Sequence, residues 1–229
     1  MKYGRWARLL PGFLRRWVMD FERRIEDAVG AFAAETPEGA RVLDAGAGET
    51  RHARAFGRQR YVAVDLAVGD PGWDYSRLDC VADLAALPFH DGSFRACLNI
   101  VTLEHVPAPH RVVGELFRVL EPGGRLLLIV PAAWEIHQAP HDYYRYTRHG
   151  VEYLVRAAGG RVVRIEAMGG FFRLLSRRLF YGLNFVPAPL VPFALLLAAP
   201  PALLLPLLDG LDRERALTLG YVCVAEKPS

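Results

Sequence analysis

The chain contains little cysteine, with only Cys80, Cys97 and Cys223 among its 229 residues. These cysteines form no Cys-x-x-Cys pair and no spacing typical of a metal site. Each lies in an apolar, strand-like stretch, where a thiol behaves as a small hydrophobic side chain. The pattern excludes a disulfide-rich scaffold, and we expect a reduced, cytoplasmic protein.

A charge imbalance is also lacking. The sequence has 28 basic and 25 acidic residues and a net charge of +3, so no overall field favours nucleic acid as a partner. Residues 1–19 include basic side chains and no acid, but Gly4, Pro11 and scattered arginines interrupt the apolar run that a signal peptide requires. We therefore expect neither nucleic-acid binding nor export.

Hydrophobic periodicity predicts an α/β protein. Apolar residues three or four positions apart predict a helix over residues 13–34, and short apolar runs then alternate with helical stretches. The predicted strands are 41–46, 61–66, 95–101, 124–131, 161–168 and 221–227, and the predicted helices are 50–56, 108–120 and 148–158. This alternation indicates a mostly parallel sheet covered on both faces.

Three regions are expected along the chain. Residues 1–38 form a basic, amphipathic helical lead-in, residues 39–169 and 218–229 form the α/β domain, and residues 170–217 form an apolar insertion. Within that insertion, Leu179 to Leu208 has no charged residue and contains six prolines.

A glycine-rich turn ends the first predicted strand, at Asp44-Ala45-Gly46-Ala47-Gly48. Glycines allow a tight turn and a close approach of a ligand to the backbone. Asp65 ends the next strand, where a carboxylate can accept hydrogen bonds from both ribose hydroxyls of a nucleoside. A dinucleotide site would require a third glycine where Arg51 stands, which disfavours NAD.

Further motifs follow in a fixed order. They are Asp83-Leu84, Leu87-Pro88-Phe89, Asp91-Gly92-Ser93-Phe94, Leu103-Glu104-His105-Val106 and Leu120-Glu121-Pro122-Gly123-Gly124. Together with the glycine loop, this set resembles the class I S-adenosylmethionine-dependent methyltransferases of the type 11 branch, over about residues 40–170 and the last strand. The resemblance implies a Rossmann-like, doubly wound, mostly parallel seven-stranded sheet with an antiparallel last strand, preceded by an apolar helical insertion.

The resemblance also implies S-adenosyl-L-methionine as cofactor and suggests the residues that hold it. The methionine portion would lie beside Asp44, Gly46 and Gly48, the ribose beside Asp65, the adenine beside Asp83 and Leu84, and the sulfonium and methionine end beside Asn99. Arg95 departs from the family, in which an acid is common at this position. Because it starts its strand away from the cofactor, we expect altered surface contacts and no loss of binding.

A dense polar cluster follows the strand at 124–131 and would emerge at the carboxyl edge of the sheet, where ligands of doubly wound folds bind. It resembles an H-x-x-P-x-D-Y-x-R-[YF]-T segment of methyltransferases linked to glycans and glycolipids. We assign His137, Asp142, Tyr144 and Arg145 to the acceptor site, with His141 as a second histidine.

Other interpretations of this cluster stay open. Asp142 and Arg145 could form an ion pair that braces the loop, and Thr147 is best explained as the cap of the helix that follows. His137 and His141 stand four apart, but Pro140 disfavours a helix and no third ligand is evident, so no metal site is predicted. The candidate general bases are Glu104, His105, His137, His141 and Asp142, with Glu104-His105 the second choice.

The predicted function is methyl transfer to an O or N atom of a small molecule, a glycan or a lipid-linked acceptor. The alternative is a cofactor-binding domain that lacks catalysis and serves as a membrane-tethered scaffold. A nucleic-acid methyltransferase ranks third, because the arginines gather beside apolar sequence and not around the predicted pocket. The acceptor, the methylated atom and the oligomeric state stay open.

The insertion predicts a contact with a membrane. In Gly170 to Leu211, aromatic and leucine side chains alternate with Arg173, Arg177 and Arg178, as in a helix at a lipid interface. Prolines leave no uninterrupted piece of about 20 residues, and the chain must return to pair its last strands, which argues against a single span. A re-entrant hairpin, an interfacial patch or an apolar lid remains, so the protein is expected in the cytoplasm or peripherally on the inner face of the cell membrane.

Overall fold

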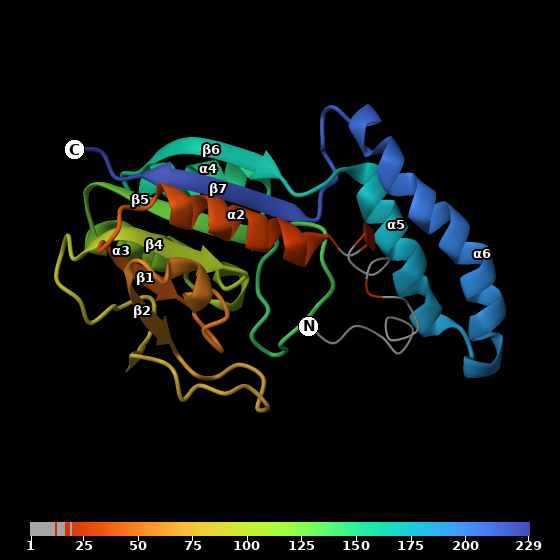
Figure 1. Ribbon diagram of the computed structural model, residues 1–229, viewed down its shortest axis with the longest axis horizontal. Coiled ribbons are helices and arrows are strands. Elements are labelled where there is room, and N and C mark those ends of the chain that lie inside the picture. Colours follow the sequence, from red (N-terminus) through yellow and green to blue (C-terminus); the bar gives the residue numbers. More distant parts are fainter. Residues whose placement is uncertain (1–11, 13–16, 19) are drawn as a thin grey trace. The chain divides into compact units, whose positions relative to one another are not determined.

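A seven-stranded sheet with the order β3-β2-β1-β4-β5-β7-β6 organises the computed structural model, which describes residues 12, 17–18 and 20–229 (Figure 1). The strands are β1 (Arg41–Ala45), β2 (Arg60–Asp65), β3 (Cys80–Val81), β4 (Phe94–Ile100), β5 (Leu120–Pro131), β6 (Arg161–Ala167) and β7 (Gly220–Glu226). The strands from β3 to β5 in this order pair in parallel. The predicted doubly wound sheet is confirmed.

The last strand runs against its neighbours. The start of β5 exchanges hydrogen bonds with the residue after β7, from Gly123 N to Lys227 O and from Lys227 N to Gly124 O. Met168 N, just past β6, donates to Gly220 O at the start of β7. Because the end of one strand meets the beginning of the other in both cases, β7 is antiparallel to β5 and β6, as predicted.

Helices cover a sheet whose central strands are buried along nearly their whole length. Val42, Leu43, Leu98 and Leu127 have no exposed surface, which explains why β1, β4 and β5 are continuous apolar runs. The helices of this part are α2 (Phe21–Glu35), α3 (Pro109–Val119) and α4 (Arg148–Ala157). Thr147 caps α4 by accepting a hydrogen bond from Gly150 N at 3.1 Å, so the capping prediction is confirmed.

Two predicted helices differ in the structure. The helix expected at Thr50 to Phe56 is wrong, since only a 3-10 turn, η2 (Ala53–Phe56), forms there. Thr50 has a φ of 56°, outside the helical range, and this left-handed residue prevents a regular helix from starting directly after the glycine loop. The helix expected from residue 13 includes α2, but residues 13–16 and 19 lie outside the described part of the chain.

Packing divides the chain into two units. The sheet unit is Ile25–Glu166 with Tyr221–Ser229, and the helical unit is Met1–Arg24 with Ala167–Gly220. The expected division at 38, 170 and 217 stays a prediction, and residues near the N-terminus pack with the insertion in the helical unit. Val18 lies in an apolar cluster with Phe180, Leu183 and Ala202, and Trp17 Nε1 donates to Leu203 O at 2.9 Å.

The helical unit contains α5 (Phe171–Gly182) and α6 (Val191–Leu204), with the 3-10 turns η4 (Leu183–Phe185), η5 (Ala188–Leu190) and η6 (Leu205–Leu211) around them. Its arginines do not all face outward as expected of a lipid-facing helix. The side chain of Arg173 is 13% exposed and lies 2.8 Å from Asp20 Oδ2, and Arg177 is buried. The prediction that these arginines lie at a lipid interface is wrong for Arg173, because it forms ion pairs with acidic residues inside the helical unit.

From Ala188 to Leu211 the chain is helical without interruption for 24 residues, which is long and apolar enough to cross a membrane by length and composition. Only 11% of its most apolar window is buried. Pro200 and Pro201 lie inside α6, so the expectation that prolines would break this stretch is wrong. The chain nevertheless returns to its starting point, since Met168 and Gly220 are hydrogen-bonded.

Candidate active site

Strained residues mark the carboxyl ends of β1, β2, β4 and β5. Thr50, Ala67, Val101 and Gln138 have φ values of 56°, 59°, 50° and 54°, and each lies in the loop that follows one of these strands. Non-glycine residues adopt this region at a cost of about 1–3 kcal/mol each, and such strain concentrates at functional sites. Carboxyl ends of parallel strands share one edge of a sheet, so these loops indicate one candidate site.

The glycine loop after β1 forms the first wall of this site. Gly46 and Gly48 have φ values of +91° and +50°, which L side chains rarely adopt. A Cβ on Gly46 would overlap the side chain of Thr102, and one on Gly48 would lie 3.3 Å from the Trp73 ring. The predicted turn is confirmed, and it requires glycine at both positions because of these φ values and these neighbouring side chains.

Asp65 joins the glycine loop to the loop after β2. Its Oδ2 accepts a hydrogen bond from Gly48 N at 2.9 Å, and its Oδ1 accepts one from Ala67 N at 2.8 Å. A carboxylate has about four lone-pair sites, so both oxygens retain capacity for ligand hydroxyls. Trp73 beside this loop was not predicted, because its signal in the sequence is only an aromatic residue in a glycine-containing loop.

The remaining predicted cofactor residues lie at the same edge. Asp83 is exposed and accepts a hydrogen bond from Ala85 N at 2.9 Å, while Leu84 beside it is buried. Asn99 is fully buried and donates from Nδ2 to Ala45 O at 2.8 Å. Its Oδ1 has no hydrogen-bond donor within the described residues, so it presents a free acceptor beside the glycine loop.

Asp44 is buried beneath the glycine loop, with 1% of its surface exposed. Its Oδ2 accepts a hydrogen bond from the hydroxyl of Tyr61. Burial raises the pKa of Asp44 to about 7, the bond from Tyr61 opposes this increase, and the charge of Asp65 adds to it. Asp44 is therefore a group whose charge changes near neutral pH.

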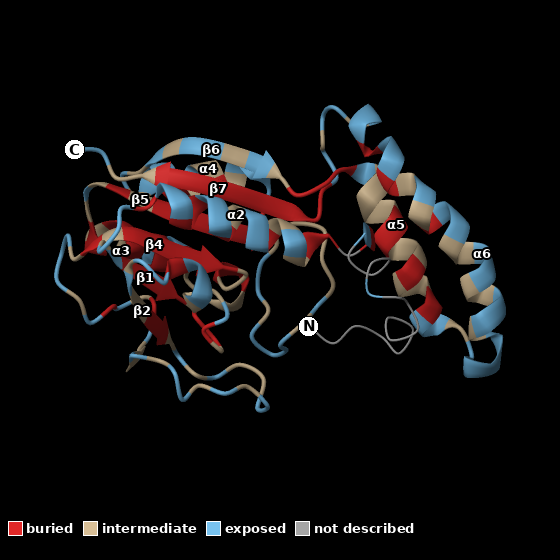
Figure 2. Cartoon of the chain, viewed as in Figure 1, coloured by how far each residue is buried: buried red, intermediate tan, exposed pale blue. Residues whose placement is uncertain are grey.

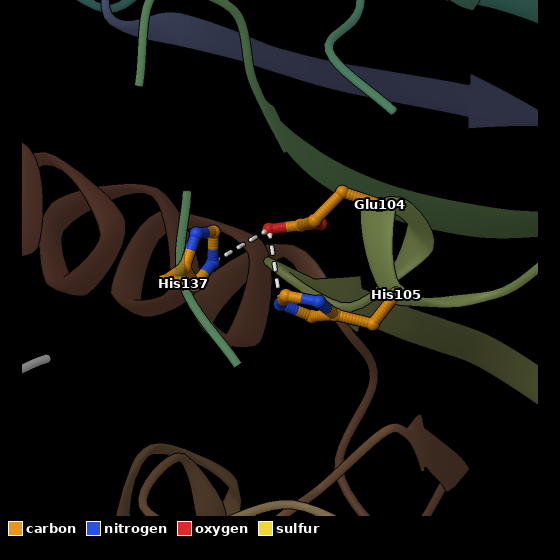
Figure 3. Close-up of side chains that lie close together, drawn as sticks. All are labelled: Glu104, His105 and His137. Atoms are coloured by element: carbon orange, nitrogen blue, oxygen red, sulfur yellow. Dashed lines mark ion pairs between the residues drawn. The ribbon is translucent and has the colours of Figure 1, made fainter. Parts of the chain in front are cut away.

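The other wall of the site is a cluster of Glu104, His105 and His137 (Figure 3), which we call the His-Glu cluster. Glu104 Oε1 lies 3.7 Å from His105 Nε2 and 3.6 Å from His137 Nε2. The Glu104 side chain is fully buried, and neither of its oxygens has a hydrogen-bond donor in the described part of the chain. A buried carboxylate without donors is costly, so these groups require a counter-charge.

Main-chain bonds hold the two parts of the cluster together. Glu104 and His105 lie in the 3-10 turn η3 (Leu103–His105) after β4, and His137 lies in the loop after β5. Tyr143 N donates to Glu104 O at 2.8 Å, and the Tyr146 hydroxyl donates to Leu103 O at 2.8 Å. The loop after β5 is therefore fastened to the turn that carries Glu104.

The hydrogen bonds of the two rings determine which nitrogen carries the proton. His105 Nδ1 lies 2.5 Å from His141 O, and His137 Nδ1 lies 3.1 Å from Glu135 O. A carbonyl oxygen only accepts, so Nδ1 is the donor in both rings and each neutral ring has its lone pair on Nε2.

The pKa values of the two rings shift in opposite directions. Burial lowers the pKa of His105. Burial also acts to lower the pKa of His137, but the contacts with Glu104, Glu135 and Asp142 outweigh it and raise that pKa overall. A proton in the cluster is therefore held on His137 in preference to His105.

The other residues predicted for the acceptor site brace the loop. Arg145 forms a bidentate pair with Asp142 at 2.6 and 2.8 Å and also donates to Glu135 O at 2.7 Å. Burial raises the pKa of Asp142, but the bonds from Arg145 and from His137 N lower it to about 2. The ion-pair interpretation is the one that this geometry supports, and Asp142 also positions His137 through the bond to its backbone N at 2.8 Å.

His141 and Tyr144 lie outside the His-Glu cluster. His141 Nδ1 is 3.0 Å from the Tyr143 hydroxyl, and the Tyr144 hydroxyl donates to Pro107 O at 3.0 Å. His137 instead contacts Glu104 and His105. The sequence signal for these contacts was the Leu-Glu-His turn directly after a buried strand, where Glu104-His105 was the second choice for the general base.

A doubly wound sheet with a glycine loop, an acidic residue after the second strand and polar loops at one edge defines a nucleoside-binding class of domain. Comparison with known proteins finds similarity to methyltransferases. Residues 43–128 match the family model described as a methyltransferase domain. This match lies within the sheet unit and runs from β1 into β5.

The relatives are similar over part of their length. The chain is 36% identical over 119 residues to an uncharacterized methyltransferase of Mycobacterium sp. (strain JLS), covering 48% of this chain and 46% of the relative. It is 37% identical over 126 residues to a demethylmenaquinone methyltransferase of Renibacterium salmoninarum, covering 52% and 49% respectively. The chain thus matches about half the length of these curated relatives.

A solved structure has the same fold. It is the 1,6-didemethyltoxoflavin-N1-methyltransferase of Burkholderia thailandensis with bound 1,6-didemethyltoxoflavin and S-adenosylhomocysteine. The similarity has a TM-score of 0.58 at 20% identity and covers 93% of this chain and 81% of that one. At this identity, the similarity establishes the fold.

The raised pKa of Asp44 predicts how stability depends on pH. The folded protein retains a proton that the unfolded chain releases above about pH 4, so this residue makes the folded state less stable as pH rises from about 4 to about 7. Asp44→Asn cannot ionise and should lack this loss, which amounts to a few kcal/mol at most. We expect its melting temperature to fall less than that of the wild type between pH 5 and pH 8. An equal fall in both proteins would contradict the assigned pKa.

Proposed function

We propose that the sheet unit binds S-adenosylmethionine and transfers its methyl group to an O or N atom of an acceptor at the His-Glu cluster. The observation that carries this proposal is the continuous edge formed by the glycine loop, Asp65 and Asn99 on one side and by Glu104 and His137 on the other. When bound, the cofactor supplies an electrophilic methyl group on a sulfonium.

The residues present fit this cofactor. Gly46 and Gly48 form the tight turn after β1 at positions where a Cβ would not fit, and Asn99 Oδ1 is a buried acceptor without a donor among the described residues. Asp65 would hold the ribose hydroxyls through its free lone pairs, and Asp83 with Leu84 would border the adenine. Asp44, buried below, would become charged more readily beside a cationic group of the ligand.

The acceptor side requires a group that favours loss of a proton, because a neutral hydroxyl or a protonated amine is a poor nucleophile. Glu104 supplies a buried negative charge, and the Nε2 atoms of both histidines supply lone pairs beside it. Asp142 and Arg145 act as positioning residues, since they hold the backbone that carries His137. Tyr144 and His141 lie in the same loop and would contact larger acceptors.

The alternative of an inactive scaffold is less well supported. A domain that only binds the cofactor has no need of a carboxylate that is fully buried without donors, and such a group destabilises the fold. Selection for stability alone would remove it, so its presence favours turnover. A small molecule, a glycan or a lipid-linked head group stays the proposed class of acceptor.

Loss of the Asp65 carboxylate tests cofactor binding. Asp65→Ala should weaken S-adenosylmethionine binding by about 1.5 to 3 kcal/mol in calorimetry, the usual scale for a hydrogen bond to a charged group. The matched control is Asp91→Ala, which removes an exposed carboxylate paired with Arg118 before β4. Unchanged affinity in a folded Asp65→Ala protein, or an equal loss in the control, would remove Asp65 from the site.

We also propose that the helical unit docks on a membrane. The exposed face of the Ala188–Leu211 helix consists of apolar residues along its length, and Figure 2 shows this exposed surface on α6. The large exposed side chains are Leu190, Phe193, Leu196, Leu197, Leu204, Leu207, Leu208 and Leu211. From Phe193 to Leu211, this stripe is about 27 Å long at 1.5 Å per residue.

A bilayer suits this stripe better than a second protein surface. Protein interfaces have a polar rim, whereas all of the stripe except Leu211 lies between Leu179 and Leu208, where the sequence has no charged residue. A helix that is apolar on all sides is either buried or in contact with lipid, and this one is mostly exposed. Because the chain returns at Gly220 to the bond with Met168, the helix would lie along the membrane surface or enter one leaflet.

Flotation with liposomes tests this docking. The wild type should float with phosphatidylcholine vesicles that contain phosphatidylglycerol, and Leu197→Glu with Leu204→Glu should abolish flotation by placing two charges in the stripe. The control replaces two exposed apolar residues outside the stripe, Tyr153→Glu with Leu217→Glu, and should float like the wild type. A wild type that stays unbound, or one that forms dimers which the stripe variant dissociates, would contradict membrane docking.

A further inference from the structure

We propose that the His-Glu cluster is a binding site for a divalent transition-metal ion, coordinated by Glu104 Oε1, His105 Nε2 and His137 Nε2 (Figure 3). Binding of the ion does not depend on the cofactor. Only the role of the ion in methyl transfer rests on the proposed function. Two histidines and one carboxylate are the ligands of catalytic zinc sites and of non-haem iron sites with open positions.

The distances between the three atoms fit a common ion. Ligands about 2.1 Å from one ion at tetrahedral angles lie about 3.4 Å apart. Glu104 Oε1 is 3.7 Å from His105 Nε2 and 3.6 Å from His137 Nε2, and all three atoms lie within 4.8 Å of one another. The two distances to Glu104 Oε1 exceed the tetrahedral spacing by 0.2 to 0.3 Å.

The hydrogen bonds around the cluster have the arrangement of a metal site. Ligating histidines usually donate their other ring N–H to a carbonyl or carboxylate, which fixes the ring and directs its lone pair to the metal. His105 Nδ1 faces His141 O, and His137 Nδ1 faces Glu135 O with Asp142 Oδ2 at 3.6 Å. Both Nε2 lone pairs therefore point to the same place as the Glu104 carboxylate.

The three side chains of the cluster present acceptor atoms to one another, and these atoms repel unless a cation lies between them. Glu104 Oε1, Glu104 Oε2, His105 Nε2 and His137 Nε2 all lack a hydrogen-bond partner among the described residues. A single proton could neutralise Glu104 through His137, but it would leave the lone pair of His105 without a donor. A divalent ion satisfies all three groups at once.

Two nitrogen ligands and one oxygen ligand are typical of zinc, and the three ligands would leave a fourth position for a small oxygen ligand. A hydroxyl oxygen of the acceptor at that position would lose its proton more readily. The O–H bond breaks, its electron pair stays on the oxygen bound to the metal, and the proton passes to water. The ion would thus favour oxygen acceptors over amines.

Metal titration of the full-length protein tests the site. After treatment with a chelator, the wild type should bind one Zn²⁺ per chain in calorimetry, and Co²⁺ should give the visible absorption of a four- or five-coordinate site. Glu104→Gln and His137→Ala should weaken Zn²⁺ binding by more than about 100-fold, and Asp142→Asn by about 10- to 100-fold, as an outer-shell residue. His149→Ala is the matched control, because its side chain is 90% exposed on α4, and it should bind as the wild type does.

The affinity of each variant for S-adenosylmethionine serves as the check on folding and separates the two proposals. A wild type that binds the cofactor but no Zn²⁺ would overturn the metal site and leave the cluster as a proton acceptor. Zn²⁺ binding that is equally strong in Glu104→Gln and His137→Ala would also overturn it. A protein that binds Zn²⁺ through these residues but not the cofactor would support the metal site and contradict the proposed function.

Discussion

The parallel pairing of β1 with β4 is the constraint on which the site depends. Chain order reverses at this pair, and in doubly wound folds ligands bind at such a reversal, outside the carboxyl ends of the strands. The pairing brings Asn99 to the carbonyl of Ala45 and Thr102 to Gly46, where no Cβ would fit. Cofactor residues and acceptor residues thus share one border, and a change in the register of β4 would separate them.

Strain and buried charge are concentrated at this edge. Val101 is β-branched and has a φ of 50°, a conformation that surrounding structure must impose. Directly after it, the chain forms the turn that directs Glu104 inward, without donors for its oxygens. A fold selected for stability alone would avoid both features. They lower the stability of the folded state, the buried core of the sheet compensates for this loss, and we attribute them to function.

Much of the fold could be predicted because buried parallel strands and amphipathic helices have clear periodicities. The strand from Phe94 to Ile100 and the helix capped by Thr147 are examples. The glycine loop was recognisable because the tight turn needs positive φ values, which glycine adopts at positions 46 and 48. The helix expected after this loop failed because a left-handed residue, Thr50, left no trace in the apolar pattern.

The acceptor side was harder to predict because its residues meet only in three dimensions. His137 and His141 were close in sequence, yet His137 contacts Glu104, which precedes it by more than thirty positions. Likewise, Arg173 looked like a lipid contact in sequence, whereas Asp20 and Asp209 neutralise it inside the helical unit. Hydrophobic periodicity indicates which face of an element is apolar. It does not indicate which charged residue, distant in sequence, will form an ion pair with a given side chain.

The central claim is that the loops after β1, β2 and β4 bind one nucleoside cofactor. Hydrogen exchange with and without S-adenosylmethionine tests this claim most directly, because it reports on each loop separately. The account predicts slower exchange in peptides that cover residues 46–50, 65–69 and 99–105, and unchanged exchange in α5 and α6. Absence of protection in these loops, or protection confined to the helical unit, would contradict it.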